Sequence, residues 1–276
     1  MPLRHPRRQT RKKGIPRNPG PAKCSPLSKS KKADKSCLPP DVKARLGRSE
    51  SCKADDGRCL IEQSSLGAEE KKKLVTAYFR PDIPEEWKKK PNAWLDSDNI
   101  KAVMKQYEAS CPHFKFIGVV PIDFSAPDPY VKAEKKCMNQ EFCLVDLKAE
   151  KAAGKTVLGA VFNLDPHYKG GSHWVGLTVD LVRNKVYYFD SYGMKPPMQV
   201  ARYMRYLHTL EPSLALESNG RRFQYTDTEC GMYSLYFIIC MINGDNFTEF
   251  CRNPIADKWM RKYRKVLFHE TKHKGQ

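Results

Sequence analysis

Long apolar runs are missing from this chain of 276 residues. The longest, Met232–Ile242, covers eleven positions and is interrupted by Ser234, whereas a membrane-spanning helix needs about 20 apolar residues. We therefore interpret this run as a buried helix and expect no membrane span. The basic N-terminus has no apolar segment behind it, so we also expect no secretory signal.

Acidic residues are almost absent from the first part of the chain. Residues 1–36 hold twelve Lys or Arg and one acid, a net charge of +11 out of +18 for the whole chain. They are also rich in Pro and Ser and poor in large apolar side chains, which predicts a disordered basic tail. Such a tail favours a polyanionic partner, above all nucleic acid. A solvated arm without a partner, or a targeting signal, is the alternative interpretation.

The ten cysteines have no secretory signal ahead of them, so we expect reduced thiols rather than a disulfide framework. A metal site built from Cys111, His113, Cys137 and Cys143 is conceivable, but neither Cys-x-His nor Cys-x5-Cys is a usual zinc spacing. Glycine-rich phosphate loops and the dinucleotide-binding signature are also missing. We therefore predict no metal and no cofactor, and leave activation by DNA or a peptide open.

The rest of the chain divides into two parts. Residues 37–92 carry short helical patterns, including a helix after Gly67 that Pro81 ends, and predict a small helical accessory arm. The main domain is expected over residues 93–276.

Helical and strand patterns alternate along this main domain. Asp96, Ser97 and Asp98 are candidate caps of its first helix. The expected elements are that helix with Ile100, Val103, Met104 and Tyr107 on one face, strands over 114–120, 156–163, 173–181 and 185–190, an amphipathic helix after Pro197, and the buried helix 233–242. Adjacent strands flanked by helices predict an α+β domain with a central sheet.

Two polar residues stand at the ends of neighbouring predicted strands. His173 begins one strand, and Asp190 ends the next. If the two strands pair as a hairpin, the start of the first lies beside the end of the second, so these side chains become neighbours. Cys230 comes just before the buried helix and is followed by Gly231.

These three side chains match the needs of a thiol nucleophile. The thiolate is the reactive form, and a helix N-terminus and a nearby imidazolium both stabilise it. Histidine holds the thiol proton and later delivers it to the leaving amine, while a carboxylate orients the ring. Each residue alone has an ordinary structural explanation: a small core cysteine, a satisfied histidine, an aspartate in a turn.

Gln224 lies six residues before Cys230. Its side-chain amide is placed to donate to an oxyanion together with the backbone N–H of the cysteine. A surface-loop glutamine is the alternative.

Residues His173-Trp174, Phe189-Asp190-Ser191 and the segment 224–231 together resemble the ubiquitin-like-protein protease superfamily. This superfamily contains the SUMO-deconjugating and the adenovirus-type cysteine proteases. The entry motif at Trp94-Leu95-Asp96 is similar as well, so the resemblance covers about residues 92–260. It implies a papain-like core with a central mixed sheet flanked by helices, the nucleophile at the N-terminus of a buried helix, and the triad Cys230, His173 and Asp190.

Within the superfamily, residues 163–166 and 170–174, the turn around Tyr192-Gly193 and the segment 229–235 resemble polyprotein-processing proteases of large nucleocytoplasmic DNA viruses such as African swine fever virus. This implies cleavage after Gly-Gly-type sequences and viral structural precursors as substrates. The expected locations are the virion and assembly sites in the host cytoplasm. The resemblance says nothing of the oligomeric state.

In the deconjugating relatives, two tryptophans flank a narrow tunnel for the glycine pair, and their positions match Trp94 and Trp174. Indole walls near the thiol admit only a backbone without side chains; ordinary core packing is the alternative. Two other functions stay open: a deconjugase for SUMO or ubiquitin-like modifiers, and a non-catalytic basic protein that binds nucleic acid.

Overall fold

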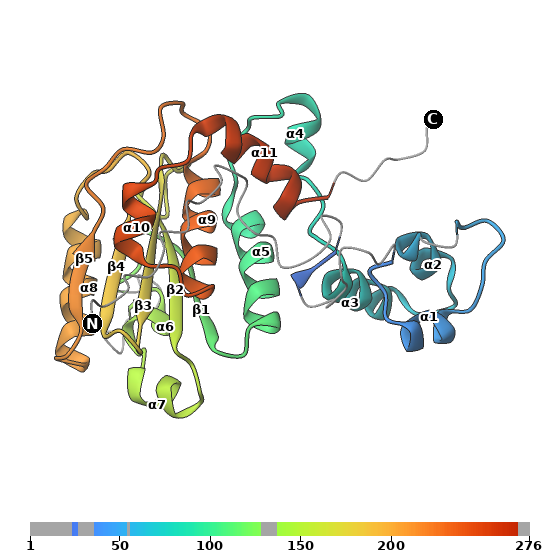
Figure 1. Cartoon of the computed structure of the whole chain (residues 1–276), viewed down its shortest axis with the longest axis horizontal. Helices are drawn as coiled ribbons and strands as arrows, with labels where there is room; N and C mark the ends of the chain where they lie inside the picture. The colour runs from blue at the N-terminus through green and yellow to red at the C-terminus, as the bar shows by residue number, and fades with distance from the viewer. Residues whose placement is uncertain (1–23, 27–35, 54–55, 128–136, 270–276) are drawn as a thin grey trace, which may run out of the picture.

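The computed structural model describes residues 24–26, 36–53, 56–127 and 137–269. Figure 1 shows a body made of a sheet and its covering helices, with a small group of helices to one side. The side group contains α1 (Pro40–Leu46), α2 (Gly57–Gln63) and α3 (Ala68–Tyr78). The helices of the body are α4 (Glu85–Lys89), α5 (Ser97–Ser110), α6 (Gln140–Cys143), α7 (Leu147–Ala152), α8 (Met198–Leu210), α9 (Cys230–Ile242), α10 (Phe247–Arg252) and α11 (Asp257–Leu267).

A mixed sheet of five strands forms the centre of the body. The strands are β1 (Phe114–Pro121), β2 (Val157–Asn163), β3 (Trp174–Asp180), β4 (Lys185–Phe189) and β5 (Ala215–Ser218), and they lie in this order. The outer pairs β1–β2 and β4–β5 are parallel, while β2–β3 and β3–β4 are antiparallel. The predicted α+β class with a central mixed sheet is therefore confirmed.

The two faces of the sheet carry separate apolar cores, because side chains alternate along each strand. On β2, Val161 faces the core that contains α5 and α9, whereas its neighbours Ala160 and Phe162 face the core that contains α8. In Figure 1, α9 lies in front of the sheet near β1 and β2, α5 stands beside it beyond β1, and α8 lies at the opposite end of the sheet near β5. The body is thus three layers deep.

Helix α9 is the central helix of the body. All of its residues are buried, which fits a segment that is apolar all round. It begins at Cys230, three residues before the expected start, so the candidate nucleophile is the first helical residue. In the described part of the chain, no helix is long and apolar enough to cross a membrane.

Helix α5 leads the chain from the arm into the sheet. Its N-cap is Asp96, whose carboxylate accepts a hydrogen bond from the backbone N–H of Asn99, while the side chain of Asn99 accepts one from the backbone N–H of Asp96. Gln106 on α5 donates to the backbone carbonyls of Thr76 and Phe79 at 2.9 and 2.7 Å. These bonds hold the helical arm against the body.

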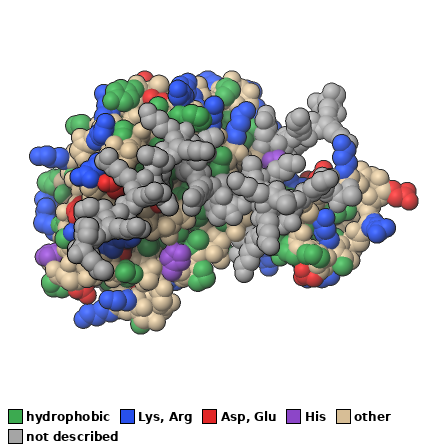
Figure 2. Space-filling model, in the orientation of Figure 1, with side chains coloured by type: hydrophobic (Ala, Val, Ile, Leu, Met, Phe, Trp, Pro, Cys, Tyr) green, Lys and Arg blue, Asp and Glu red, His purple; other side chains and the backbone are tan. Residues whose placement is uncertain are grey.

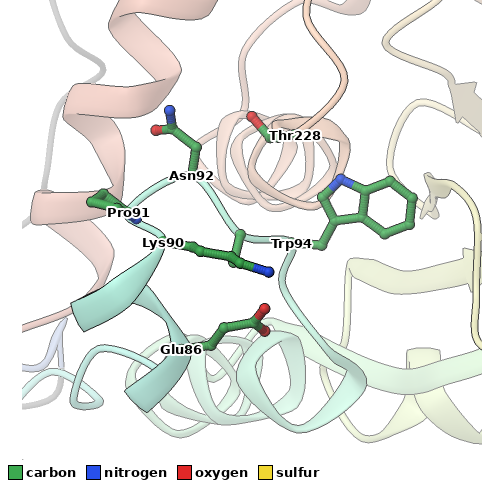
Figure 3. A pocket seen from close by; sticks show the side chains of 7 residues that line it. Glu86, Lys90, Pro91, Asn92, Trp94 and Thr228 are labelled. Atoms are coloured by element: carbon green, nitrogen blue, oxygen red, sulfur yellow. The ribbon is translucent and has the colours of Figure 1, made fainter.

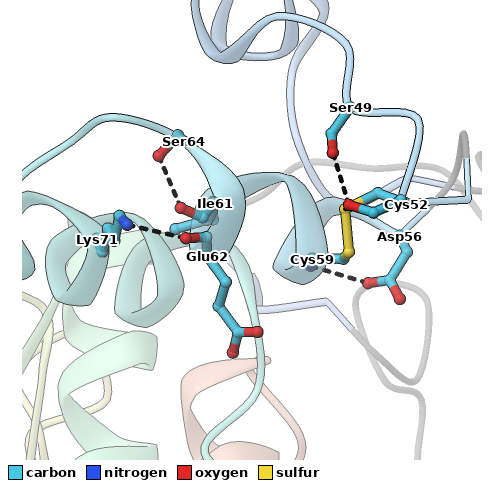
Figure 4. The surroundings of a disulfide bond; sticks show 9 residues. Ser49, Cys52, Asp56, Cys59, Ile61, Glu62, Ser64 and Lys71 are labelled. Carbon is cyan, nitrogen blue, oxygen red and sulfur yellow. Dashed lines mark hydrogen bonds between the residues drawn. A yellow bond between two sulfur atoms is a disulfide. The ribbon is translucent and has the colours of Figure 1, made fainter.

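The arm has a small core and is crosslinked. Disulfides join Cys24 to Cys37 and Cys52 to Cys59, the second of which is drawn in Figure 4. A third joins Cys137 to Cys143 in the body. The expectation of reduced thiols is therefore wrong for six of the ten cysteines. The physical reason in the arm is its size: its core cluster has only six buried residues, and small units gain most from crosslinks.

Part of the predicted basic tail belongs to this arm. Cys24 and Ser25 are buried, and the backbone N–H of Ser25 donates to the carbonyl of Tyr78 at 3.0 Å. The expectation of disorder over residues 1–36 is therefore wrong for residues 24–26; residues 1–23 and 27–35 lie outside the described residues. At the other end of the predicted arm, Trp87 packs in the main core against Phe268, with ring centres 5.1 Å apart.

Candidate active site

The hairpin of β3 and β4 brings His173 and Asp190 together. Gly176 on β3 pairs with Phe189 on β4, so the residue just before β3 and the residue just after β4 lie at the same end. His173 Nε2 is 2.7 Å from Asp190 Oδ1, and the aspartate side chain is 1% exposed. Burial keeps water from competing for this bond and strengthens it.

Backbone hydrogen bonds fix the orientation of Asp190. The carboxylate oxygen that meets the imidazole also accepts from the backbone N–H of Tyr192 at 2.8 Å. Asn219, just after β5, accepts from the backbone N–H of Asp190 at 2.9 Å and donates to its carbonyl at 2.7 Å. Asn219 was not among the sequence candidates, because its partner lies 29 positions away and no local pattern marks it.

The thiol of Cys230 completes the group. It interacts with the imidazole of His173 and acts on the pKa of that ring. Burial lowers the pKa of His173, but the bonds to Asp190 and Cys230 and the charges of both outweigh burial and raise this pKa from 6.5 to about 9. The imidazole therefore holds a proton at neutral pH, as a thiolate–imidazolium pair requires.

The N-terminus of helix α9 adds a positive electrostatic potential at Cys230. Cys230 is the first residue of α9, where free backbone N–H groups and the helix dipole stabilise negative charge. Gly231 follows for a steric reason: a Cβ there would lie 3.2 Å from Leu95 and 3.3 Å from the Trp174 ring. Glycine at this position lets Leu95 and the indole of Trp174 approach the candidate nucleophile Cys230 closely.

The two predicted tryptophans differ in their exposure to solvent. Trp174 is buried beside Gly231, and its Nε1 donates to the carbonyl of Leu95 at 2.8 Å. Trp94 is 43% exposed, and its Nε1 donates to the carbonyl of Asp227 at 2.8 Å. A ring that is nearly half exposed is not core packing, so Trp94 is available to a ligand. It also lines a pocket of about 580 Å³ with Lys90 and Glu86 (Figure 3).

Gln224 is fully buried, and its amide group is oriented by its partners. Its Oε1 accepts from the Ser191 hydroxyl at 2.7 Å, so Nε2 points the other way. Nε2 donates to the Thr226 carbonyl and lies 3.4 Å from the Tyr192 hydroxyl. The ring of Tyr192 stacks on the imidazole of His173, with centres 4.7 Å apart. The structure thus brings Gln224 to the edge of the candidate site.

The segment between Gln224 and Cys230, which we call the nucleophile loop (224–229), is held by two buried side chains that the sequence did not reveal. The Asp257 carboxylate accepts from the backbone N–H groups of Tyr225 and Thr226 at 2.9 and 3.0 Å. Arg264 forms an ion pair with Glu229 at 2.9 Å. Asp257 and Arg264 both lie on α11, more than thirty positions after the loop residues that they bind.

Arg264 connects three segments around the site. Besides the ion pair with Glu229, its guanidinium donates to the carbonyls of Thr228 and Ala93 at 2.9 and 2.8 Å. Its Cζ lies 4.2 Å from the ring centre of Trp87. The same side chain therefore fixes the nucleophile loop and the segment that leads to Trp94.

The residues considered as a metal site do not gather. Cys137 and Cys143 are bonded to each other, and the imidazole of His113 contacts the carbonyl of Ile242 at 3.1 Å. Within the described ranges, no group of three or more His, Cys, Asp or Glu side chains is placed to hold a metal ion.

Comparison with known proteins agrees with this geometry. Residues 148–274 match the Ulp1 protease family, C-terminal catalytic domain. R355 of Acanthamoeba polyphaga mimivirus, which is named as a thiol protease, is 30% identical over 248 residues, covering 86% of this chain and 76% of that protein. The chain belongs to the Ulp1 protease family. It is accordingly a cysteine protease, and the matched range contains the candidate residues His173, Asp190 and Cys230.

The likeness extends beyond the family's catalytic domain. A cysteine protease of African swine fever virus is 26% identical over 257 residues, or 84% of this chain and 91% of that protein. The crystal structure of the African swine fever virus pS273R protease superposes with a TM-score of 0.69 at 22% identity, covering 93% of this chain and 98% of that one. The fold of this Ulp1-family protease, arm included, is thus shared.

The His173 environment gives a pH prediction. Because Asp190 raises the pKa of His173, the Asp190→Asn variant should lower it. If His173 acts in its protonated form, kcat/KM should fall as pH rises through about 9 in the wild type. In Asp190→Asn this alkaline limb should move to lower pH. A pH–rate profile of both proteins measures it; an unmoved limb would show that another group governs it.

Arg264 gives a stability prediction. Arg264→Met leaves Glu229 buried without its partner, and breaking such a pair costs about 3–5 kcal/mol. Urea unfolding should show this loss, whereas Lys265→Met, at the exposed neighbouring position, should change stability by less than about 0.5 kcal/mol. Adding Glu229→Gln to Arg264→Met should recover part of the loss. No recovery would mean that the bonds of Arg264 to Ala93 and Thr228 dominate instead.

Proposed function

We propose that this Ulp1-family protease is an endopeptidase that works through Cys230, His173 and Asp190. The sulfur of Cys230 attacks the scissile carbonyl carbon while His173 holds the thiol proton. Collapse of the tetrahedral intermediate breaks the C–N bond, and His173 gives its proton to the leaving amine. Water, deprotonated by His173, then attacks the thioester and releases the acid and the thiol. The observation that carries this proposal is the buried 2.7 Å contact of His173 with Asp190 beside Cys230.

The oxyanion of the intermediate needs donors at the same place. The backbone N–H of Cys230 at the start of α9 is one candidate, and the amide of Gln224 is the other. The Gln224 Nε2–H at 3.4 Å from the Tyr192 hydroxyl makes only a weak bond, so it is the donor available to an oxyanion.

Gln224→Ala should therefore lower kcat by about a hundredfold or more while KM changes little. Steady-state kinetics on a Gly-Gly peptide measures both constants. Ser191→Ala is the companion variant: it removes the hydroxyl that orients the amide but keeps the donor, so its loss should be smaller. A pure rise in KM for Gln224→Ala would instead make this residue a substrate contact.

The proposed cleavage site follows a Gly-Gly-type sequence. Support comes from the place of Trp174 against Gly231 and from the half-exposed Trp94. Two indoles near the thiol leave room for a backbone without side chains and exclude larger residues. Replacing either glycine of a test peptide by alanine should reduce kcat/KM strongly, and equal cleavage of both peptides would overturn this specificity.

The proposed substrates are viral structural precursor proteins, matured during assembly in the virion and at assembly sites in the host cytoplasm. Relatives that span most of the chain come from viruses, which supports this choice. The test is incubation of the purified protein with candidate capsid precursors, followed by mass-spectrometric mapping of the new ends. Ends that never follow glycine would contradict the proposal.

A second candidate function is removal of a ubiquitin-like modifier. Proteases from several African swine fever virus isolates are named SUMO-1 cysteine proteases, and one of them is 34% identical to this chain over 139 residues. A fluorogenic SUMO C-terminal substrate, compared with a Gly-Gly peptide of the same leaving group, separates the two functions. A much higher kcat/KM for the SUMO substrate would favour deconjugation.

Nucleic acid is proposed as a further partner of the basic tail. Residues 1–23 hold eight Lys or Arg and no acid, and deleting them spares the Cys24–Cys37 disulfide. If they make about five phosphate contacts, deletion should flatten the log–log salt dependence of DNA binding by about four to five units. Identical slopes for the full and shortened chains would show that the tail binds no DNA. The same experiment with a peptide substrate present tests activation by DNA.

A further inference from the structure

A ladder of stacked side chains leads away from the imidazole of His173. The ring of Tyr192 stacks on the imidazole, with centres 4.7 Å apart and planes 18° apart. The guanidinium carbon of Arg222 lies 5.1 Å from the Tyr192 ring centre and 4.9 Å from that of Tyr225. Arg222 is thus held between two aromatic faces, one ring beyond the catalytic histidine.

Backbone contacts fix this arginine in place. Its Nε donates to the carbonyl of Gln224 at 2.6 Å. Gly193, with a φ of +76°, packs so tightly that a Cβ there would lie 2.8 Å from the backbone carbon of Arg221. Asp257 anchors the backbone of Tyr225. The turn after Asp190 and the start of the nucleophile loop are therefore pressed together, and the guanidinium loses little freedom when it binds a ligand.

The charge of Arg222 is not used inside the described part of the protein. No carboxylate there lies within ion-pair distance of it, and the residue is exposed. Asp227, in the nucleophile loop, acts on Tyr192 through its charge but forms no ion pair with Arg222. An oriented guanidinium whose two terminal nitrogens bind no residue in the described ranges fits a carboxylate, because its planar fork matches the two carboxylate oxygens.

A pocket of about 400 Å³ continues from this arginine, between the start of the nucleophile loop and the start of α11. Arg221, Arg222 and Lys258 are its three basic residues, and all three are exposed. The one acid in its lining, Asp257, is buried and accepts two backbone hydrogen bonds. Exposed Tyr225 forms a wall. Figure 2 shows Lys and Arg side chains scattered over the visible face of the molecule. The pocket is therefore positive and suits an acidic peptide segment.

The position of these stacked side chains indicates whether they contact the substrate before or after the scissile bond. Trp94 and Trp174 flank the proposed glycine side. His173 must face the leaving amine to protonate it, so the residues after the scissile bond, which we call the leaving side, pass the imidazole. Tyr192 covers one face of that ring, and Arg222 follows. We infer that Arg222 binds a carboxylate of the leaving side, and that the pocket with Arg221 and Lys258 receives an acidic segment. This inference rests on the proposed function.

The test uses peptides that share a Gly-Gly cleavage site and differ only by Glu or Gln at one of the first four leaving-side positions. At one position at least, the wild type should cut the Glu peptide with a kcat/KM about five- to tenfold above the Gln peptide, as expected for a partly exposed charge pair. The difference should lie mainly in KM and shrink at about 0.5 M salt, because screening weakens the pair.

Arg222→Gln should bring this Glu/Gln ratio to about one, and Arg222→Lys, which keeps the charge but loses the planar fork, should retain part of it. The matched control is Lys262→Gln, which removes one exposed charge on the outer side of α11 next to Trp259; its ratio should equal that of the wild type. Thermal melts of all variants check folding.

Two results would overturn the inference: a wild-type ratio of one at all four positions, or a ratio that Arg222→Gln leaves unchanged. If the wild type cuts neither peptide, the proposed function fails, and binding then decides the subsite separately. Fluorescence anisotropy of leaving-side peptides should then show tighter binding of the Glu peptide to the wild type than to Arg222→Gln. Equal binding to both proteins would exclude the subsite.

Discussion

Cys230→Ala is expected to lower kcat for a Gly-Gly peptide by at least about four orders of magnitude, since loss of the nucleophile of a triad removes covalent catalysis altogether. The fold should survive. Cys230 is buried at the start of α9, and replacing its thiol by a hydrogen leaves only a small cavity beside Gly231. Peptide cleavage followed by mass spectrometry, with a thermal melt of the same sample, measures both effects.

Cys240→Ala is the matched control for this variant. Cys240 is buried on the same helix and is also free of disulfides, but it lies far along α9 from His173. It should keep cleavage within a few-fold of the wild type. Cleavage by Cys230→Ala at a rate near that of the wild type would show that another group is the nucleophile, whatever the control does.

The centre of the site was predictable from local patterns. Alternating apolar residues marked β3 and β4, and the short turn between them indicated that they pair as a hairpin. A hairpin places His173 beside Asp190 by geometry alone. The apolar run after Cys230 marked a buried helix, whose start carries the thiol. These elements are defined by residues close in sequence, so a single sequence contains the information.

The supports of the site were not predictable in this way. Arg264, Asp257 and Asn219 each bind residues about thirty positions or more away, and a lone Arg or Asp in an amphipathic helix looks like a solvated surface residue. Strand β5 has four residues, most of them exposed, so it carries no apolar alternation. Long-range contacts of polar residues depend on the tertiary fold, which composition and periodicity do not encode.

The cysteines show a different limit. Composition and length favoured reduced thiols, but Cys24 and Cys37 meet because residues 24–25 pair with the chain around Phe79. That pairing lies in a stretch whose Pro and Lys content predicted disorder. A global average over the tail concealed Cys24, which belongs to the small core of the arm, and the buried Ser25 beside it.

His173→Ala is expected to be nearly as severe as loss of the nucleophile, with kcat reduced by about three to four orders of magnitude. Without the imidazole, Cys230 has no partner for its proton and the leaving amine has no donor. The cavity left between Tyr192 and Asp190 is open to water, because the His173 side chain is 11% exposed, so the fold should remain. Asp190→Ala should retain more activity, since Tyr192 stacking still holds the ring.

Alkylation of Cys230 by iodoacetamide at about pH 7 separates two roles of His173: stabilising the thiolate and donating a proton to the leaving amine. The wild-type thiol lies against an imidazole whose pKa is raised to about 9, so an imidazolium is present to stabilise the thiolate, and labelling should be fast. His173→Ala removes that charge, so the labelling rate should fall together with kcat, while Asp190→Ala should label at an intermediate rate. If His173→Ala lost activity but labelled as fast as the wild type, the histidine would serve only the leaving amine, and the dipole of α9 alone would sustain the thiolate.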